Sequence, residues 1–588
     1  MAQPSSAASQ APPPAAVPPG CKGLDNVDIV PDEGVSPLSR QLLEGCLRRK
    51  AAQVTSLIGQ GADPRAIGGL RVRGSTDPSY WRYSCLFFAI DSPSNYPLLY
   101  AEGDDDTDVP VVLPQWSSRQ LQRDVINALI DGGADINASA HQRADINASA
   151  KADRPIKVAI AGGNLTAVEA LLARQVDVRG FVVMQLPRLF EGGAAPSATR
   201  EYEDALMSVY RRLAQHDSTL AAERWGGHNL VHLAARNSTA EFSQSFIDEY
   251  LDLITSHGAD MTATDTTGWT PLHWVAGHGS PCVVHWLCRH LRSDDVNRGL
   301  PHLPGLPHLP NKTPLAVAAI YCTEQQQQQG EGNEERSRLI REYKTIIGVL
   351  LRGGAAPSIA RMPTATEAHR RQRQLVLTEY ATVLSELSEA VMSAINAALA
   401  PQRDHSMLLA RLLPLAPHHD GAHPHPSPSN MAFGPHEAEA IAWKIGAFLH
   451  EPPAAVAAID QYLIGESVLR RRVRAAVGHF VKSAATQTSS NREVVGGTRH
   501  EQQGDKRVKV TLPPLQCFAV RGSGGQVVGT GVREVVHRAR LDEAVSHGVV
   551  GVVKGFNKHL GDQDCQFEWG QLGRIDKGTG LFVPLGID

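Results

Sequence analysis

Residues 270–276 read Thr-Pro-Leu-His-Trp-Val-Ala, and this stretch decides the fold. Thr270 is a good helix N-cap, because its hydroxyl can accept a hydrogen bond from an amide of the first turn. Pro271 suits the first helical position, where its missing N–H costs nothing. Leu272 and Ala276 are four residues apart and therefore share one face of the helix. The sequence thus predicts a short helix with one buried side.

A second helix follows the first after a glycine. Gly279 ends the first helix, and the chain then carries a stripe of apolar residues at helical spacing. A polar turn leads out of this helix pair. The stripe consists of Val283, Val284, Leu287 and Cys288, and the turn reads Asp294-Asp295-Val296-Asn297.

Five other stretches repeat this order of helix, second helix and glycine turn. A glycine after a helix can adopt the left-handed conformation that many helix ends require. The first helices are expected at Leu42, Ser84–Ala89, Arg154–Ala159, Asn229–Ala235 and Thr313–Ala319, and the closing turns at Gly61–Asp63, Gly133–Asn137, Asp177, Gly258–Asp260 and Gly353–Ala355.

Six such units in register resemble the ankyrin-repeat family over residues 36–360. The resemblance implies an ankyrin-repeat α-solenoid over these residues. Together with the patterns after residue 360, it predicts a mainly α fold: the solenoid, followed by additional helices and a small α+β C-terminal region. His232 and His273 match the histidine of the family motif, which has a structural hydrogen-bonding role. We therefore expect neither of them to be catalytic.

The resemblance also locates a binding surface. Ankyrin repeats stack into a curved array with a concave face, which is lined by turn tips and by residues that flank the first helices. Trp269 is a candidate hot spot, because Trp, Tyr and Arg dominate such anchors; the alternative is that it packs under a neighbouring insertion. The residues that match these positions are Asp153, His228, Arg236, Asn237, Thr266, Thr267, Trp269, His278, Lys312, Ile320 and Tyr321.

Composition limits the classes of function. The 588 residues carry a formal net charge of -4, so nucleic acid is not an expected partner. Eight scattered cysteines without a CxxC pair indicate reduced thiols rather than disulfides or a zinc site. No membrane insertion, metal, cofactor or small-molecule substrate is expected, and the start of the chain does not resemble a secretory signal. We expect a cytoplasmic protein, with the nucleus as the alternative.

Insertions interrupt the repeats. The simpler interpretation of these insertions is the drift of short sequence repeats, and the alternative is a flexible partner-binding loop. Residues 179–226 also separate two repeats, and Glu201–Gln215 is predicted to be helical, as an inserted or degenerate unit. The insertions are the tandem ADINASA at 134–140 and 144–150, the tandem GLPHLP at 299–304 and 305–310, the run Gln325–Gln329 and the acidic loop Glu102–Asp108.

The expected domains follow from these patterns. After residue 360, helices are predicted at 364–400, 404–413, 436–450, 454–463 and 466–485, and strands at 508–512, 517–520 and 581–583. Residues 539–562 match ankyrin spacing without the Thr-Pro cap and form a candidate degenerate repeat. The boundaries are a disordered N-terminus at 1–34, the ankyrin array at 35–360, a helical region at 361–485 with a His/Pro-rich linker at 414–435, a linker at 486–507 and an α+β region at 508–588.

Three stretches were considered as chemical sites, and each has a plainer interpretation. Gly522–Val527 lacks the third glycine of a dinucleotide loop and predicts a hairpin turn instead. The histidines at 418–425 lie in a Pro-rich stretch that is typical of a linker. Arg470, Arg471, Arg472 and Arg474 could form a nuclear import or nucleic-acid patch, or the polar face of an amphipathic helix.

We therefore expect a non-enzymatic scaffold or adaptor that binds partner proteins through the concave ankyrin face. One alternative is an enzyme whose ankyrin array delivers substrate to an unrecognised C-terminal domain. The other is a nuclear regulatory protein that acts through the basic cluster at Arg471.

Overall fold

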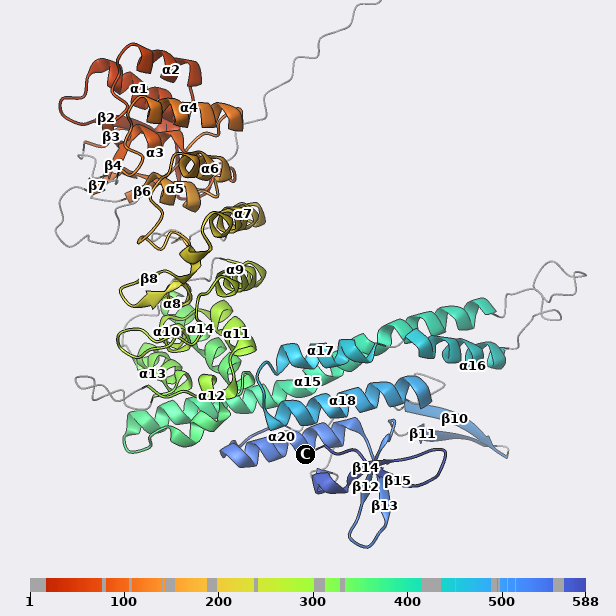
Figure 1. Ribbon diagram of the computed structural model, residues 1–588. Coiled ribbons are helices and arrows are strands. Elements are labelled where there is room, and N and C mark those ends of the chain that lie inside the picture. The colour runs from red at the N-terminus through yellow and green to blue at the C-terminus, as the bar shows by residue number, and fades with distance from the viewer. Residues whose placement is uncertain are drawn as a thin grey trace, which may run out of the picture. The chain divides into compact units, whose positions relative to one another are not determined.

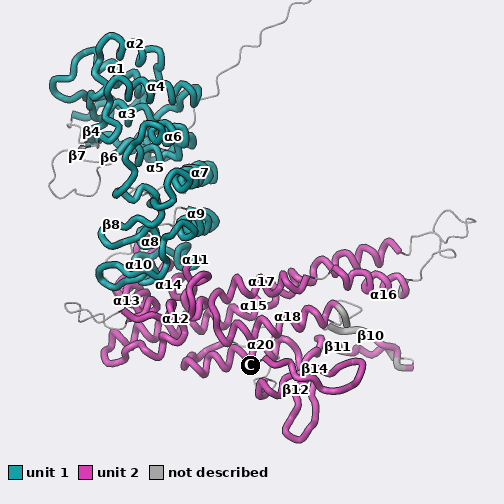
Figure 2. Tube along the Cα trace, viewed as in Figure 1, with its two compact units in different colours: residues 1–286 teal, residues 287–588 magenta. Residues whose placement is uncertain are grey.

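The chain divides into two compact units, residues 1–286 and 287–588, in a computed structural model (Figures 1 and 2). The structure describes residues 17–76, 81–104, 108–138, 141–142, 154–187, 198–236, 242–300, 312–327, 334–413, 435–449, 451–487, 494, 497–504, 506–512, 514–553 and 565–587.

Unit 1 is built mainly from helices that follow one another in pairs (Figure 1). In most pairs the first helix is short and the second is longer. The helices are α1 (Pro37–Leu47), α2 (Ala51–Gly59), α3 (Cys85–Ala89), α4 (Arg119–Asp131), α5 (Pro155–Ala161), α6 (Leu165–Ala173), α7 (Arg200–His216), α8 (Leu230–Arg236), α9 (Gln244–Ser256) and α10 (Pro271–His278), while α11 (Pro281–His290) spans the boundary to unit 2.

Helix α10 forms as its sequence predicts. The Thr270 side chain accepts a hydrogen bond from the backbone N–H of His273, and Pro271 occupies the first turn. Gly279 ends the helix in the left-handed conformation at φ 80°, where a residue with a Cβ would be strained. Leu272 and Ala276 are buried on the same side. After α11, the expected polar turn at 294–297 contains a single helical turn, α12 (Ser293–Val296).

The helices of unit 1 form two rows. First helices α1, α3 and α5 contact in turn, as do α8 and α10. Second helices α2, α4, α6, α7 and α9 also contact in sequence order. Helix α7, which was predicted at 201–215 as an inserted or degenerate unit, therefore stands in the second row between α6 and α9. Between α5 and α8, turns at 179–184 occupy the described chain where a first helix would lie.

A β-sheet in unit 1 departs from the sequence analysis, which expected only loops around the second repeat. The acidic stretch at 102–108 connects two antiparallel strands, β5 and β6, and residues 105–107 lie outside the described chain. Strand order is β1-β6-β5-β3-β4-β7, and β2 pairs with β3. The strands are β1 (Lys22–Gly23), β2 (Val27–Pro31), β3 (Ile67–Val72), β4 (Trp81–Ser84), β5 (Leu99–Glu102), β6 (Asp108–Val112) and β7 (His141–Gln142), and a separate hairpin joins β8 (Arg224–Trp225) to β9 (His228–Asn229).

Unit 2 begins within α11 and continues with a last helix pair, α13 and α14. A 46-residue helix, α15, follows and is contacted by α16, α17, α18 and α20. Its apolar face includes buried Val383, Leu387 and Ile395. The helices are α13 (Pro314–Gln327), α14 (Glu334–Arg352), α15 (Glu367–Leu412), α16 (Pro435–Gly446), α17 (Pro452–Tyr462), α18 (Val468–Gln487) and α20 (Val532–His547).

Helix α15 replaces the two helices predicted at 364–400 and 404–413. Pro401 lies in the gap between the two predicted helices, and proline removes a helical hydrogen bond, yet the helix continues through it. By length and composition α15 could cross a membrane, but 44% of its most apolar stretch is buried within the fold. Buried apolar positions of this kind are typical of a core helix.

Two glycines bring the last helix pair against the helical region of unit 2. A Cβ atom on Gly465, between α17 and α18, would lie 1.9 Å from the carbonyl oxygen of Gly353 at the end of α14. A Cβ atom on Gly353 would in turn lie 2.7 Å from the Cys288 Sγ. The Gly465 N–H donates to the Arg352 carbonyl at 3.2 Å. Only glycine fits at both positions without a shift of the backbone.

The C-terminal strands partly follow the sequence analysis. The linker predicted at 486–507 contains β10 and part of β11, which form an antiparallel hairpin. The turn predicted at 522–527 joins β12 to β13, where the Gly522 N–H donates to the Gln526 carbonyl at 2.8 Å. A four-stranded sheet has the order β13-β12-β14-β15. The strands are β10 (Gly497–Gln503), β11 (Lys506–Leu512), β12 (Phe518–Arg521), β13 (Val527–Thr530), β14 (Leu572–Ile575) and β15 (Phe582–Pro584).

The candidate degenerate repeat at 539–562 is described only in its first half. Helix α20 begins at Val532, earlier than the motif suggested, and ends at Gly548, which is left-handed at φ 69°. The stretch that would hold a second helix, 554–564, lies outside the described residues, as do the copies ADINASA 144–150 and GLPHLP 305–310.

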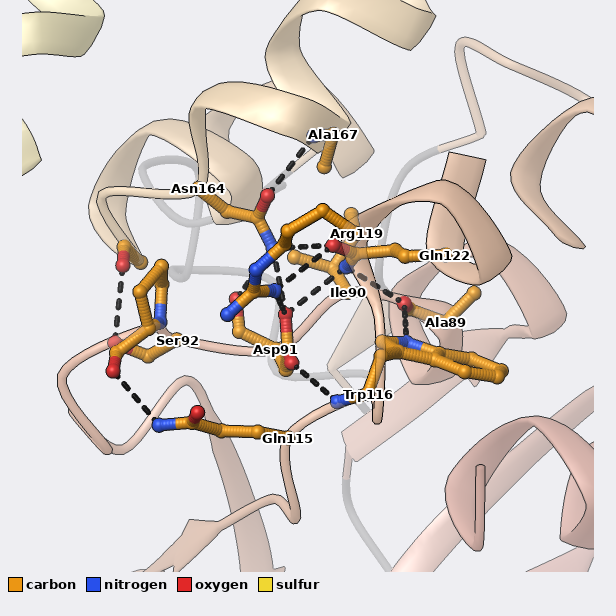
Figure 3. Close-up of polar contacts among 12 residues, drawn as sticks. Ala89, Ile90, Asp91, Ser92, Gln115, Trp116, Arg119, Gln122, Asn164 and Ala167 are labelled. Atoms are coloured by element: carbon orange, nitrogen blue, oxygen red, sulfur yellow. Dashed lines mark hydrogen bonds and ion pairs between the residues drawn. The ribbon is translucent and has the colours of Figure 1, made fainter. Parts of the chain in front are cut away.

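A buried carboxylate connects two helix pairs of unit 1 (Figure 3). Asp91, which follows α3, is fully buried. It accepts hydrogen bonds from the backbone N–H of Trp116 at 2.8 Å, from Arg119 at 2.6 Å, from Gln122 at 3.0 Å and from Asn164 at 2.7 Å. Arg119 and Gln122 belong to α4, whereas Asn164 caps α6 of the next pair. The polar cluster is satisfied from within the fold, so its role is structural.

The first helix pair joins the same cluster through Arg49. Its guanidinium donates to the carbonyls of Ile90 at 3.2 Å and Pro114 at 2.6 Å, and also to that of Phe88. It lies 5.1 Å from the centre of the Trp116 ring. Burial lowers the pKa of Arg49 to about 10.

We predict that Asp91→Ala lowers the free energy of unfolding by about 3–5 kcal/mol, because it leaves Arg119 and three amide donors without the carboxylate that they share. The control is Asp124→Ala, which removes an exposed carboxylate from α4, the helix that carries Arg119 and Gln122, and should cost less than about 0.5 kcal/mol. Urea unfolding followed by circular dichroism measures both. Equal unfolding midpoints for the two variants would contradict a structural role for Asp91.

Candidate functional site

The residues predicted for the concave face fall into three groups. Asp153 and Asn237 lie outside the described residues. Lys312, Ile320 and Tyr321 belong to unit 2, on or beside α13. The other six lie in unit 1, on two neighbouring turns and on helices α8 and α10; they are His228, Arg236, Thr266, Thr267, Trp269 and His278.

The first of the two turns is the hairpin of β8 and β9. Gly226 and Gly227 form its tip with φ angles of 58° and 89°, and Trp225 pairs directly with His228. Directly opposed residues of antiparallel strands place their side chains on the same face. Trp225, which is 48% exposed, therefore extends the surface that His228 begins.

The second turn spans Asp265 to Trp269. The backbone N–H of Asp265 donates to the Trp269 carbonyl at 2.9 Å, and Gly268 is left-handed at φ 77°. The Asp265 carboxylate accepts from the backbone N–H groups of Thr267 at 2.7 Å and Trp269 at 2.9 Å, and from Trp274 Nε1 at 2.8 Å. One buried side chain thus fixes both the turn and the indole of Trp274 on α10.

The two turns meet directly. A Cβ atom on Gly227 would lie 2.8 Å from Thr266 Cγ2, so the hairpin tip packs closely against the second turn. Burial against this neighbour and a positive φ both require glycine at this position.

Trp274 is the centre of an aromatic cluster. Its ring contacts His228 edge-on at 4.7 Å, Trp269 edge-on at 6.0 Å and His278 in a stacked arrangement at 4.7 Å between ring centres. These spacings are those of favourable aromatic pairs. We call Trp225, His228, Trp269, Trp274 and His278 the aromatic row. Trp269 and Trp274 are half-buried, and His278 is exposed.

His232 supports the row from beneath. It is buried, and its Nε2 lies 3.1 Å from the Trp269 carbonyl oxygen, so Nε2–H donates to that oxygen. Burial lowers the pKa of His232 to about 4. His273 occupies the equivalent place on α10, with its Nδ1 2.8 Å from the Thr270 hydroxyl. Both histidines make structural hydrogen bonds, as the sequence analysis expected.

The surroundings of the aromatic row lower the pKa of two groups, His278 and Asp265. Loss of hydration beside Trp274, followed by the charges of Arg236 and His228, lowers the pKa of His278. Burial raises the pKa of Asp265, but the hydrogen bonds from Thr267, Trp269 and Trp274 outweigh it and the net shift is downward. Asp265 is therefore a carboxylate at neutral pH.

The predicted residues of unit 2 include one stacked aromatic pair. Tyr321 stacks on Tyr343 of α14 with ring centres 6.1 Å apart. Burial lowers the pKa of Lys312, and Ile320 is half-buried. These three residues carry no cluster comparable to the aromatic row.

Sequence reasoning missed Trp225, Asp265 and Trp274. Trp274 lies inside the Thr-Pro-Leu-His motif and was assigned to the helix, although its spacing of five residues from Trp269 was visible. Asp265 could have been recognised from Asp-Thr-Thr-Gly, a pattern typical of a turn in which the aspartate accepts from the following amides. Trp225 lay in a stretch that was treated as an insertion.

Residues 267–297 match the family model of the ankyrin repeat. The chain is an ankyrin-repeat protein. The matched segment of this ankyrin-repeat protein begins in the second turn and includes Trp269, Trp274 and His278. The aromatic row thus lies partly on the repeat that the family model matches.

A solved structure similar to this ankyrin-repeat protein is the ankyrin repeat domain of Bcl-3, described as a unique member of the IkappaB protein family. The two sequences are 16% identical, and the match covers 53% of this chain and 99% of that one with a TM-score of 0.25. This superposition supports no conclusion about the arrangement of the repeats. No curated protein matches the chain.

Unit 2 of the ankyrin-repeat protein has two places to consider as chemical sites: the His-rich stretch and a pocket between helices. The histidines at 418–425 lie outside the described residues, and within the described chain no group of three metal-binding side chains occurs. A small pocket of about 50 Å³ lies between α15, α18 and α20. Its polar lining consists of Asn396, Arg403, Arg533 and Glu534, and Glu534 accepts from the Gly531 N–H. This lining contains no nucleophile paired with a base.

We predict that acidification destabilises unit 1 through His232. A free histidine titrates near pH 6.5, whereas folded His232 has a pKa of about 4. Unfolding therefore takes up a proton between these values, so the free energy of unfolding should fall by roughly 2 kcal/mol between pH 7 and pH 5. Urea unfolding at both pH values measures the change.

His232→Gln should reduce this pH dependence, and the exposed His216→Gln should retain it. A wild-type protein that is equally stable at pH 7 and pH 5 would show that His232 is not a buried neutral histidine.

Proposed function

We propose that this chain is a non-enzymatic scaffold or adaptor that binds partner proteins through the aromatic row on its ankyrin turns. The observation that carries the proposal is the aromatic row itself: exposed Trp225 and half-buried Trp269 on two packed turns, beside half-buried Trp274 and exposed His278 on α10. Exposed aromatic side chains on a rigid support are typical of binding hot spots. A repeat array that holds such side chains on successive turns would act as the concave face of a solenoid.

The support under the row favours this interpretation. Rigid anchors lose less conformational entropy on binding than mobile ones. Asp265 holds the Trp274 indole by a hydrogen bond, and His232 holds the Trp269 backbone. The turns are thus organised before any partner arrives.

The alternative of a nuclear role through the basic cluster receives less support. Arg470 and Arg474 pair with Asp460 at 3.0 and 3.7 Å, and Arg472 pairs with Asp542 at 3.1 Å. These ion pairs favour the interpretation as the polar face of α18. We therefore propose a cytoplasmic location. Microscopy of a variant with Arg470 to Arg472 changed to Ala tests it, and loss of nuclear signal would restore the import role.

We predict that Trp225→Ala combined with Trp269→Ala reduces capture of partner proteins at least about tenfold. The physical reason is that truncation of each anchoring tryptophan should cost at least about 1–2 kcal/mol of binding free energy. The assay is a pull-down with the full chain, read by quantitative mass spectrometry. Phe448→Ala is the matched control, since Phe448 is an aromatic residue that is 87% exposed in unit 2. Unchanged capture by the Trp variant, with both variants folded, would reject the proposed face.

A further inference from the structure

Two arginines accompany the aromatic row. Arg224 precedes Trp225 on β8, and Arg236 ends α8, one turn of helix after His232. Both side chains are exposed. Their charges reach two histidines of this region: besides burial, the charge of Arg224 lowers the pKa of His232 beneath the row, and the charge of Arg236 lowers the pKa of His278 within it.

The carboxylates on the same segments are already bound. Of the described residues on these turns, three are acidic, and each accepts hydrogen bonds from its own surroundings. Glu223 accepts from the Gly180 and Val182 N–H groups, Asp260 from Thr262, and Asp265 from Thr267, Trp269 and Trp274. The Asp265 side chain is 1% exposed, so it cannot meet a charge from outside. The face thus presents indole and imidazole rings flanked by positive charge.

We propose that the partner segment that occupies the aromatic row is acidic: its carboxylates bind Arg224 and Arg236 while an apolar side chain packs on the indoles. The inference rests on the proposed protein-binding function and specifies the chemistry of the partner. Arginine suits this role because its planar guanidinium can bind a carboxylate through two parallel hydrogen bonds. Complementary charge also determines which partner is accepted and how fast it associates.

Other occupants fit less well. A cationic segment would meet two exposed arginines, while the three carboxylates of these turns already accept hydrogen bonds from their own surroundings, so like-charge repulsion costs affinity. Nucleic acid would be drawn by a larger basic surface, whereas the whole chain has a net charge of -4. An acidic protein segment uses both features of the face, the rings and the arginines.

The test uses the full chain and three short fluorescein-labelled peptides measured by fluorescence anisotropy. Each peptide holds one Phe, flanked by Glu and Asp in the acidic probe, by Gln and Asn in the neutral probe and by Lys in the basic probe. We expect wild type to bind the acidic probe about tenfold more tightly than the neutral one, and salt to weaken this preference. Arg224→Glu with Arg236→Glu should lose the preference and favour the basic probe.

The matched control is Arg40→Glu with Arg200→Glu, which makes the same change in charge at two other exposed positions of unit 1. This variant should bind the acidic probe as wild type does, and thermal unfolding should show that all variants are folded. The inference is overturned if wild type does not distinguish the acidic from the neutral probe, or if both double variants behave alike. It is also overturned if a single-stranded oligonucleotide displaces the acidic probe and depends on the same arginines.

The two proposals can fail separately. If the Trp225→Ala, Trp269→Ala variant loses partner capture while the Arg224→Glu, Arg236→Glu variant captures partners normally, the face binds proteins but not through acidity. If neither variant changes capture, the protein-binding function of this face fails as well.

Discussion

The Asp265 carboxylate is the constraint on which the exposed face depends. It accepts two backbone N–H groups of its own turn and the indole N–H of Trp274. A buried charge is costly unless such donors surround it, so the turn, the helix and the carboxylate define one another. His232 connects this arrangement to the preceding repeat through the Trp269 carbonyl. The order of the surface therefore comes from hydrogen bonds between repeats rather than from the exposed rings themselves.

The repeats themselves were predictable because their signals are local. Caps, left-handed glycines and apolar stripes act within about ten residues, and Thr270, Pro271 and Gly279 behave as expected. The sheet around β3 to β6 was not predictable in the same way. Its strands are short, and strand pairing depends on partners distant in sequence. Pro401 was misleading for a related reason: tertiary packing along α15 overrides a local break.

The sequence analysis named His228, Trp269 and His278 as candidate binding residues, but not the residue that joins them. In the structure the rings of all three contact Trp274. Trp274 was missed because it lies within the helix motif, where the sequence analysis sought structural residues only. The other predicted residues, Lys312, Ile320 and Tyr321, belong to unit 2, whereas the aromatic row lies in unit 1. Which side chains meet between neighbouring turns and helices depends on how these elements pack, and a sequence motif does not specify that packing.

The hairpin tip at Gly226 and Gly227 has a consequence for how this surface can change through evolution. The glycines and the buried Asp265 and His232 carry the geometry, whereas Trp225 and Arg224 contribute mainly exposed side chains. Exposed positions away from packed features tolerate substitution at little cost in stability. The outer residues can therefore drift toward new partners while the inner ones stay fixed. A surface divided in this way allows duplicated genes to diverge in recognition without first losing their fold.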